Sequence, residues 1–145
     1  MATRTQSVTE LQKLRVVDAM HPGVIACPFE TSLQTVARMM ATYRVHAVVV
    51  LGHEGDEIPG GAIWGVVSDT DLLQAARAPE FDAQTASELA ATPALTIASS
   101  ESLERAVQLM VENELSHLIV VERRSGRPIG VLSTLDVARA LARLE

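Results

Sequence analysis

The sequence predicts an α+β fold in which two β-α-β-β-α repeats pack with pseudo-two-fold symmetry. Residues 16–51 align with residues 86–121 without a gap at an offset of 70, and apolar character matches better than residue identity. At an offset of 65, residues 65–71 align with residues 130–136, and the same glycine, serine and aspartate recur. Because repeats of this size rarely fold alone, we expect each to bury the apolar face of the other.

The repeat also suggests how the chain divides into parts. Val8, Leu11 and Leu14 have spacings that suit a short amphipathic helix ahead of the first repeat. Between the repeats, Thr85 and Glu88 are spaced to cap a one-turn helix. The expected parts are a helical N-terminal segment at 1–15, the first repeat at 16–78, a linker at 79–85 and the second repeat at 86–145.

Each repeat is expected to begin with a short strand followed by an amphipathic helix. The strands are predicted at Val24–Ala26 and Leu95–Ile97, each followed by a polar turn with capping residues. Apolar residues at i, i+3, i+4 and i+7 then predict one buried stripe on each helix. The stripes are Leu33, Val36, Ala37 and Met40 in the first repeat, and Leu103, Ala106, Val107 and Met110 in the second.

A β-hairpin and a second helix are expected to complete each repeat. The predicted hairpin strands are Val48–Leu51 with Ile63–Val67, and Leu118–Val121 with Ile129–Leu132. Ser68 and Ser133 follow directly and open the final helices.

Composition and charge disfavour several classes of function. The chain has 12 Lys and Arg against 18 Asp and Glu, a formal charge of −6, and only 3% aromatic residues, so we expect no nucleic-acid binding. The longest apolar run, Ala47–Leu51, is far shorter than the ~20 residues of a membrane span. A lone cysteine, Cys27, and a polar N-terminal stretch predict a reducing, cytoplasmic location.

The recurrent polar pattern is Gly-h-h-Ser-x-x-Asp, where h is apolar. It ends in Ser68 and Asp71 in the first copy and in Ser133 and Asp136 in the second. In one interpretation the serine and aspartate form a capping box at the start of the helix. In the other, the same carboxylate accepts two hydroxyl hydrogens from a ribose diol, while helix N–H groups and the hydroxyl favour an anion. Both can hold together.

Antiparallel pairing in the hairpins supplies neighbours for these serines. It should bring His46 and Ala47 beside Ser68. In the second copy it should bring Ser116 and His117 beside Ser133. Only Arg44, His46 and His117 are basic groups expected near the two motifs, so a nucleoside or monophosphate is easier to accommodate than a triphosphate.

The doubled motif and its surroundings resemble a tandem pair of CBS domains, the regulatory modules named after cystathionine beta-synthase. The resemblance covers residues 16–144, and it includes matched openings of each repeat at Val16, Asp18 and Met20 and at Ala86, Glu88 and Ala90. It implies two three-stranded sheets that pack across a pseudo-two-fold and leave two inter-repeat clefts. It also implies a homodimer formed through helix faces, and ligands such as AMP, ADP, ATP or S-adenosylmethionine.

Positions carried over from the resemblance define the expected binding residues. Asp71 and Asp136 would bind ribose hydroxyls, and Ser68 and Ser133 would approach the sugar or phosphate. The backbone of Val24, Ile25 and Ala26, and of Leu95, Thr96 and Ile97, would meet the base edge, with Val48 and Leu118 lining the base pocket. The family commonly has proline at the next position, where this chain has Val49 and Ile119 and so regains a backbone N–H.

Other kinds of site are disfavoured by the sequence. The four histidines share no metal-ligand spacing and Cys27 has no partner, so no metal is expected. The acidic loop His53–Glu57 could hold a hard cation, although such a loop is more often only solvated. No histidine stands between serine and aspartate in the order a catalytic triad needs, so we expect no enzyme and no cofactor.

Two functions are therefore carried forward from the sequence. The first is a stand-alone regulatory module that senses an adenosine-containing ligand and signals through its dimer geometry or an unidentified effector protein. The second is a ligand-free structural dimer or adaptor with the same fold, in which both Ser-x-x-Asp boxes are caps only.

Overall fold

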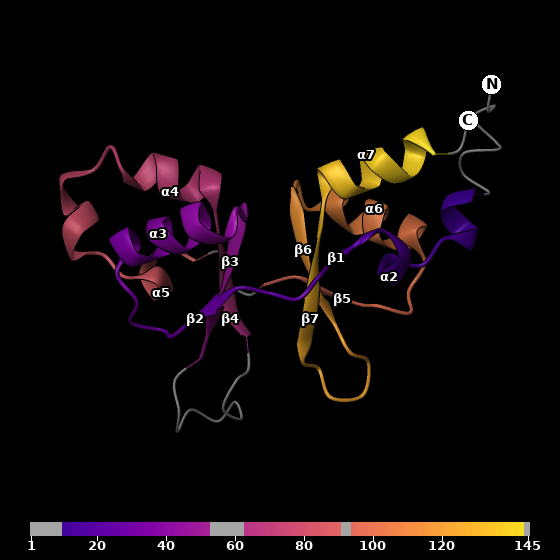
Figure 1. The fold of residues 1–145 in the computed structure, drawn as a ribbon, viewed down its shortest axis with the longest axis horizontal. Coiled ribbons are helices and arrows are strands. Elements are labelled where there is room, and N and C mark those ends of the chain that lie inside the picture. Colours follow the sequence, from indigo (N-terminus) through magenta and orange to yellow (C-terminus); the bar gives the residue numbers. More distant parts are fainter. Residues whose placement is uncertain (1–9, 53–62, 91–93, 144–145) are drawn as a thin grey trace. The chain divides into compact units, whose positions relative to one another are not determined.

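A computed structural model describes residues 10–52, 63–90 and 94–143 of the chain. The chain forms two compact units (Figure 1). Unit 1 combines Met1–Gly23 with Leu95–Glu145, and unit 2 is Val24–Ala94. Each unit is a mixed sheet covered by helices, so the predicted α+β class is confirmed.

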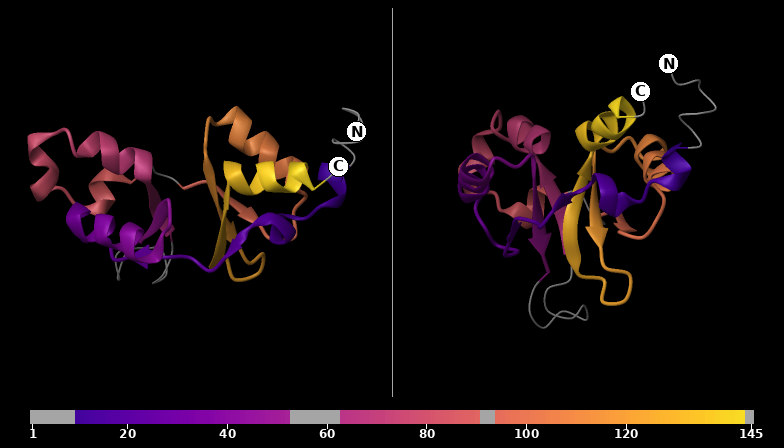
Figure 2. Two further views of the ribbon diagram at one scale, coloured as in Figure 1. Left: turned by 45° about the horizontal axis from the view of Figure 1, so that its top comes forward. Right: turned by 45° about the vertical axis from the view of Figure 1, so that its right-hand side comes forward.

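Unit 2 contains a three-stranded sheet in the order β2-β3-β4. Strands β2 and β3 are parallel, and β3 and β4 form the predicted antiparallel hairpin. Helices α3, α4 and α5 lie on one face of this sheet (Figures 1 and 2). The elements are β2 (Ala26–Cys27), α3 (Leu33–Tyr43), β3 (Ala47–Leu51), β4 (Ile63–Ser68), α4 (Asp69–Ala75), the 3₁₀ helix η1 (Pro79–Ala83) and α5 (Ala86–Leu89).

Helix α3 shows how local sequence sets these boundaries. The Ser32 hydroxyl accepts a hydrogen bond from the Thr35 N–H at 3.2 Å and caps the start of the helix. The helix ends at Arg44, which adopts a left-handed conformation with φ of 55°. The apolar stripe predicted between Leu33 and Met40 faces the core of unit 2.

Unit 1 contains a four-stranded sheet in the order β1-β7-β6-β5. Strand β1 is antiparallel to β7, β7 is antiparallel to β6, and β6 is parallel to β5. Helices α2, α6 and α7 cover one face of it (Figures 1 and 2). The elements are α2 (Val16–Ala19), β1 (His21–Pro22), β5 (Thr96–Ala98), α6 (Leu103–Glu112), β6 (His117–Val121), β7 (Pro128–Ser133) and α7 (Thr134–Ala142).

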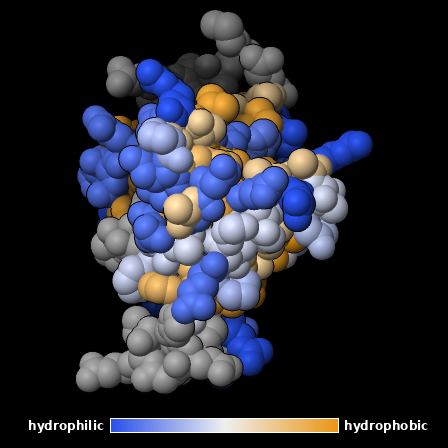
Figure 3. Space-filling model, turned by 90° about the vertical axis from the view of Figure 1, so that its left-hand side faces the viewer, coloured by the Kyte–Doolittle hydropathy of each residue, from blue (hydrophilic) through white to orange (hydrophobic). Residues whose placement is uncertain are grey.

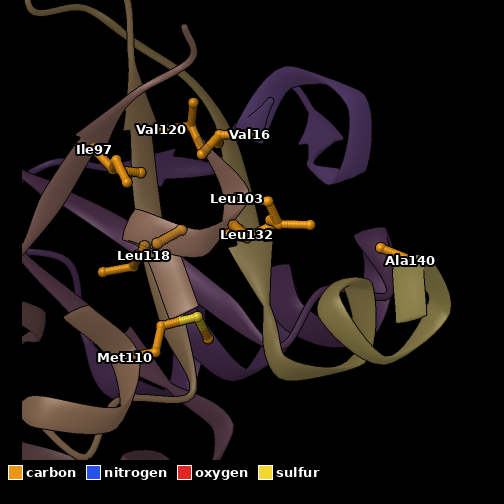
Figure 4. Close-up of a cluster of buried hydrophobic side chains, with 9 residues drawn as sticks. Val16, Ile97, Leu103, Met110, Leu118, Val120, Leu132 and Ala140 are labelled. Carbon is orange, nitrogen blue, oxygen red and sulfur yellow. The ribbon is translucent and has the colours of Figure 1, made fainter. Parts of the chain in front are cut away.

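Each unit has its own hydrophobic core between its sheet and its helices. Figure 4 shows the core of unit 1, where Leu103, Leu118 and Leu132 are fully buried and meet Val16 from α2. Leu11 and Leu14 also pack against this core, and residues 10–13 are helical as expected, whereas Val8 lies outside the described residues. The equivalent core of unit 2 contains Val36, Met40, Val48, Val50 and Val67.

The sequence repeats and the compact units are different sets of residues. Helix α2 and strand β1 precede the sheet of the first repeat, yet both belong to unit 1, where β1 pairs with β7 of the second repeat. Helix α5 opens the second repeat and packs in unit 2, beside β4. Thr85 and Glu88 form the capping box expected at the start of α5. Each unit therefore takes its short opening helix from the other repeat.

Candidate functional site

The first copy of the motif lies where β4 passes into α4. Ser68 is the N-cap residue, and its Oγ accepts a hydrogen bond from the Asp71 N–H at 3.1 Å. In return, Asp71 Oδ2 accepts a hydrogen bond from the Ser68 N–H at 3.0 Å. This reciprocal pair is a capping box, so the capping interpretation of the first copy is confirmed.

The second copy has the same arrangement where β7 passes into α7. Ser133 Oγ accepts from the Asp136 N–H at 3.2 Å, and Asp136 Oδ2 accepts from the Ser133 N–H at 2.8 Å. The Ser133 hydroxyl also donates to Asp136 Oδ2 at 3.0 Å. In both copies one oxygen of the aspartate is therefore committed to the backbone of the serine.

Hairpin pairing brings the predicted neighbours to these serines. Ala47 is paired with Ser68, and His117 is paired with Ser133. The backbone carbonyl of His46 accepts a hydrogen bond from the Asp69 N–H at 2.9 Å. In the second copy, the carbonyl of Ser116 accepts from the Thr134 N–H at 3.0 Å. The start of one hairpin strand thus lies beside the helix start in each unit, as the sequence predicted.

The imidazoles predicted at the site are already engaged by neighbouring side chains. His46 Nδ1 lies 2.9 Å from Asp69 Oδ2, and both side chains are at least half exposed. His117 Nδ1 lies 3.0 Å from the hydroxyl of Ser116. Any positive charge on His46 therefore lies beside the carboxylate of Asp69, the first residue of α4.

The predicted base-edge segments use their carbonyls in the sheets. The carbonyl of Ile25 accepts a hydrogen bond from the Val49 N–H at 2.9 Å, and that of Leu95 accepts from the Ile119 N–H at 3.3 Å. A proline in place of Val49 or Ile119 would have no N–H to donate. The departure from the family's proline therefore adds one parallel-ladder bond per unit, and each carbonyl keeps a second lone pair for a ligand.

Strand alternation places the side chains expected to line the base pocket. Val48 and Leu118 are fully buried members of the two cores. Ala47 and Val49, their neighbours in β3, point to the other face of the strand. The side chain of Val48 is thus used in packing, and the sequence did not distinguish the two faces of a strand whose every residue is apolar.

The remaining residues of the base-edge segments differ in their access to solvent. Val24, Ile25 and Ala26 are half-buried, as is Leu95. Thr96 is exposed, whereas Ile97 is buried in the core of unit 1.

The two aspartates of the motif have different surroundings. Asp71 is half-buried, and among the described residues its Oδ1 accepts no hydrogen bond. Asp136 is only 3% exposed, and its Oδ1 lies 2.9 Å from Nδ1 of His21 and 3.8 Å from Nη1 of Arg139. Sequence reasoning missed His21, because 115 residues separate it from Asp136 and no motif spacing connects them.

Across 10–52, 63–90 and 94–143, no group of three or more His, Cys, Asp or Glu side chains could hold a metal ion. The acidic loop His53–Glu57 lies outside the described residues. No described helix reaches the length and hydropathy needed to cross a bilayer.

Comparison with protein families and solved structures gives a consistent fold. The family model of the CBS domain matches residues 16–78 and 86–143. The CBS domain protein PAE2072 from Pyrobaculum aerophilum, solved in complex with AMP, is 24% identical with a TM-score of 0.76, over 90% of this chain and 98% of that one. A search of curated protein sequences found no significant match.

Two further structures share this fold at lower identity. The CBS domain pair of protein MJ0100, solved with 5′-methylthioadenosine and S-adenosyl-L-methionine, has a TM-score of 0.77 at 16% identity, over 91% of this chain and 98% of that one. The CBS domain of a bacterial CNNM/CorC family Mg²⁺ transporter, solved with ATP, has a TM-score of 0.75 at 20% identity, over 95% of this chain and 94% of that one.

Proposed function

The chain belongs to the CBS domain family through both of its repeats, and from this we propose that it is a regulatory module that binds an adenosine-containing ligand. Binding by the structural neighbours supports the ligand class, since they were solved with AMP, ATP, 5′-methylthioadenosine and S-adenosylmethionine. The chain signals by favouring one arrangement of its dimer or one grip on an effector protein, which requires unequal ligand affinity for the two states.

The Asp71 carboxylate is the observation that carries this proposal. Its Oδ2 completes the cap of α4, and its Oδ1 accepts no hydrogen bond from the described residues. An ionised carboxylate has lone pairs for about four acceptor sites, so the cap leaves room for two hydroxyl donors. The cis-diol of a ribose supplies two such donors at adjacent carbons.

Charge decides which adenosine-containing ligands fit this carboxylate. Residues 24–94 carry three Arg against nine Asp and Glu, so the whole formal charge of −6 lies in unit 2, and the rest of the chain balances nine against nine. Figure 3 shows the side of the molecule that carries α3 and α4, where hydrophilic side chains predominate. Because like charges repel, we favour a nucleoside, a monophosphate or the cationic S-adenosylmethionine over ATP.

Thermal denaturation with AMP, ADP, ATP, S-adenosylmethionine and NADH tests the proposal. A ligand at about 100 times its Kd adds roughly 2.7 kcal/mol to the free energy of unfolding. The expected result is a rise in Tm of several degrees with at least one compound. Asp71→Asn, which keeps an oxygen for the cap and loses the charge, should remove the rise.

The alternative function is a ligand-free dimer or adaptor with the same fold. The completed capping boxes favour it, because they explain both Ser-x-x-Asp pairs without a ligand. The absence of any Tm rise in folded wild-type protein would decide for this alternative.

Exposed apolar side chains on the motif helices support a homodimer in either case, and the lone cysteine, Cys27, supports a reducing, cytoplasmic location. Leu73 of α4 is 74% exposed and Leu135 of α7 is 54% exposed. Each leucine lies on the helix that a motif serine caps, and the family resemblance implies a dimer formed through helix faces, so we assign both side chains to that interface. Light scattering should give twice the chain mass, and Leu135→Glu combined with Leu73→Glu should halve it.

A further inference from the structure

The Asp136 carboxylate is held by four groups of its own unit. Oδ2 accepts from the N–H and the hydroxyl of Ser133, and Oδ1 faces His21 at 2.9 Å and Arg139 at 3.8 Å. When the carboxylate is ionised it only accepts hydrogen bonds, and Nδ1 of His21 is then the donor of this contact. Both oxygens of Asp136 are therefore engaged inside unit 1.

Burial closes the same carboxylate to an incoming diol. Asp136 is 3% exposed, whereas the side chain of His21, whose Nδ1 lies 2.9 Å from Asp136 Oδ1, is 67% exposed. A ribose that reached Asp136 would have to displace the His21 imidazole. The buried carboxylate would then lose one hydrogen-bond donor before the ribose hydroxyls replaced it. Loss of a hydrogen bond to a buried charged group costs more than loss of one between neutral groups.

The first copy of the motif differs from the second at the sequence position that aligns with His21. The offset of 70 between the repeats brings Ala91 to the position of His21. An alanine side chain has no hydrogen-bonding atom. Asp71 is half-buried, and its Oδ1 accepts nothing from the described residues. Among the described residues the two aspartates therefore differ in their partners, and the aligned repeats differ at the position of His21.

We propose that His21 reserves Asp136 for the fold, so that each chain binds one adenosine-containing ligand, at Asp71, rather than two. This inference rests on the proposed function and deepens it. In this proposal the His21 imidazole competes with the ribose hydroxyls for the carboxylate of Asp136, and so sets the number of ligand sites per chain. Removing its side chain would convert the second copy of the motif into a second ligand site.

Isothermal titration with S-adenosylmethionine and with AMP measures the number of sites. Wild-type protein should bind one equivalent, Asp71→Asn should lose at least about tenfold in affinity, and Asp136→Asn should retain one equivalent. His21→Ala should raise the number of sites to two. Arg139→Ala is the matched control, because it removes the longer contact to Asp136 and leaves His21 in place, so it should keep one site.

Several results of the titration would overturn the inference. Two sites in wild type, or loss of binding in a folded Asp136→Asn variant, would show that Asp136 already takes ligand. A single site in His21→Ala would show that the imidazole is not the barrier. If neither the wild type nor any variant bound either ligand, the proposed function would be overturned. The contact between His21 and Asp136 can still be tested in that case, by a measurement that uses no ligand.

A double-mutant cycle tests the contact without ligand. His21→Ala and Asp136→Asn are made singly and together, and unfolding in urea is measured for each. If the two side chains interact, the effect of His21→Ala on the unfolding constant should shrink at least about threefold in the Asp136→Asn background. Additive effects would overturn the assignment of His21, whatever the titration shows.

Discussion

Gly130 lies so close to His21 that a Cβ added to Gly130 would stand 2.5 Å from the His21 carbonyl oxygen. The same Cβ would stand 2.8 Å from Sδ of Met20. The glycine of the second motif copy therefore lets β1 lie against β7, with Pro22 paired to Gly130. This close approach also holds His21 where its imidazole meets Asp136.

Gly130→Ala should separate β1 from β7. The new methyl group cannot fit against a backbone oxygen at 2.5 Å, so the strand must shift. We expect a loss of about 2 kcal/mol or more in the free energy of unfolding, measured by urea denaturation. Gly126→Asn is the control: Gly126 has φ of 70° with nothing within 4 Å of a built Cβ, and asparagine tolerates that conformation. Equal losses in both variants would contradict the steric explanation.

Ser133→Ala and Ser68→Ala should each weaken the start of one helix. Each change removes the acceptor for the N–H of the motif aspartate. The expected cost is about 1 kcal/mol per variant in chemical denaturation. Asparagine caps about as well as serine, so Ser68→Asn should restore most of the loss. An unaffected Ser133→Ala variant would argue against the capping box.

Val16→Ala tests whether α2 belongs to the core of unit 1. Val16 is 0% exposed and packs with Leu103 and Leu132, although it comes from the other repeat. We expect a cost of roughly 2 kcal/mol, because the deleted methyl groups leave a cavity. Val17→Ala, at a position that is 49% exposed, should change stability by less than about 0.5 kcal/mol. Similar small effects at both positions would place α2 outside the core.

The buried thiol of Cys27 should make stability fall at alkaline pH. Burial raises the pKa of Cys27 above its ordinary value of 9.0 and outweighs the opposing effect of a hydrogen bond with Thr31. The unfolded chain then releases its thiol proton at lower pH than the folded chain. The free energy of unfolding is therefore unaffected by this thiol below about pH 9 and decreases as the pH rises above that value. Cys27→Ala should flatten this part of the urea-denaturation profile. An unchanged profile would contradict the prediction.

A ligand without the ribose diol should bind poorly at Asp71. 2′-Deoxyadenosine offers one hydroxyl fewer than adenosine, so the carboxylate loses one charge-assisted hydrogen bond. We expect at least about a tenfold loss of affinity, consistent with 1.5–3 kcal/mol for a hydrogen bond to a charged group. Competition against S-adenosylmethionine measures it. Equal affinities would show that the carboxylate does not hold the sugar.

Local patterns were enough to predict much of the fold. The stripe from Leu33 to Met40 predicted α3, and Ser68 and Ser133 marked the starts of α4 and α7. Helical periodicity and caps involve residues three or four apart, so one stretch of sequence contains the whole signal. Hairpin pairing likewise placed Ala47 beside Ser68.

The face of a fully apolar strand could not be predicted in this way. Val48 and Val49 are both buried valines, and nothing in their side chains says which one enters the core of unit 2. The hydrogen bond from the Val49 N–H to Ile25 was equally hidden, because it depends on the register of two strands separated by a helix.

The two repeats, their helices and hairpins, and the paired Ser-x-x-Asp caps could all be predicted from patterns along the chain. By contrast, the membership of α2 and β1 in unit 1 and the 2.9 Å contact of His21 with Asp136 are evident in the fold and in no sequence pattern. The physical reason is distance along the chain: a contact between residues 115 apart arises from where the chain crosses, and no local pattern records it. Asp71 and Asp136 occupy equivalent positions in the two sequence motifs, but they have different neighbours in the folded chain.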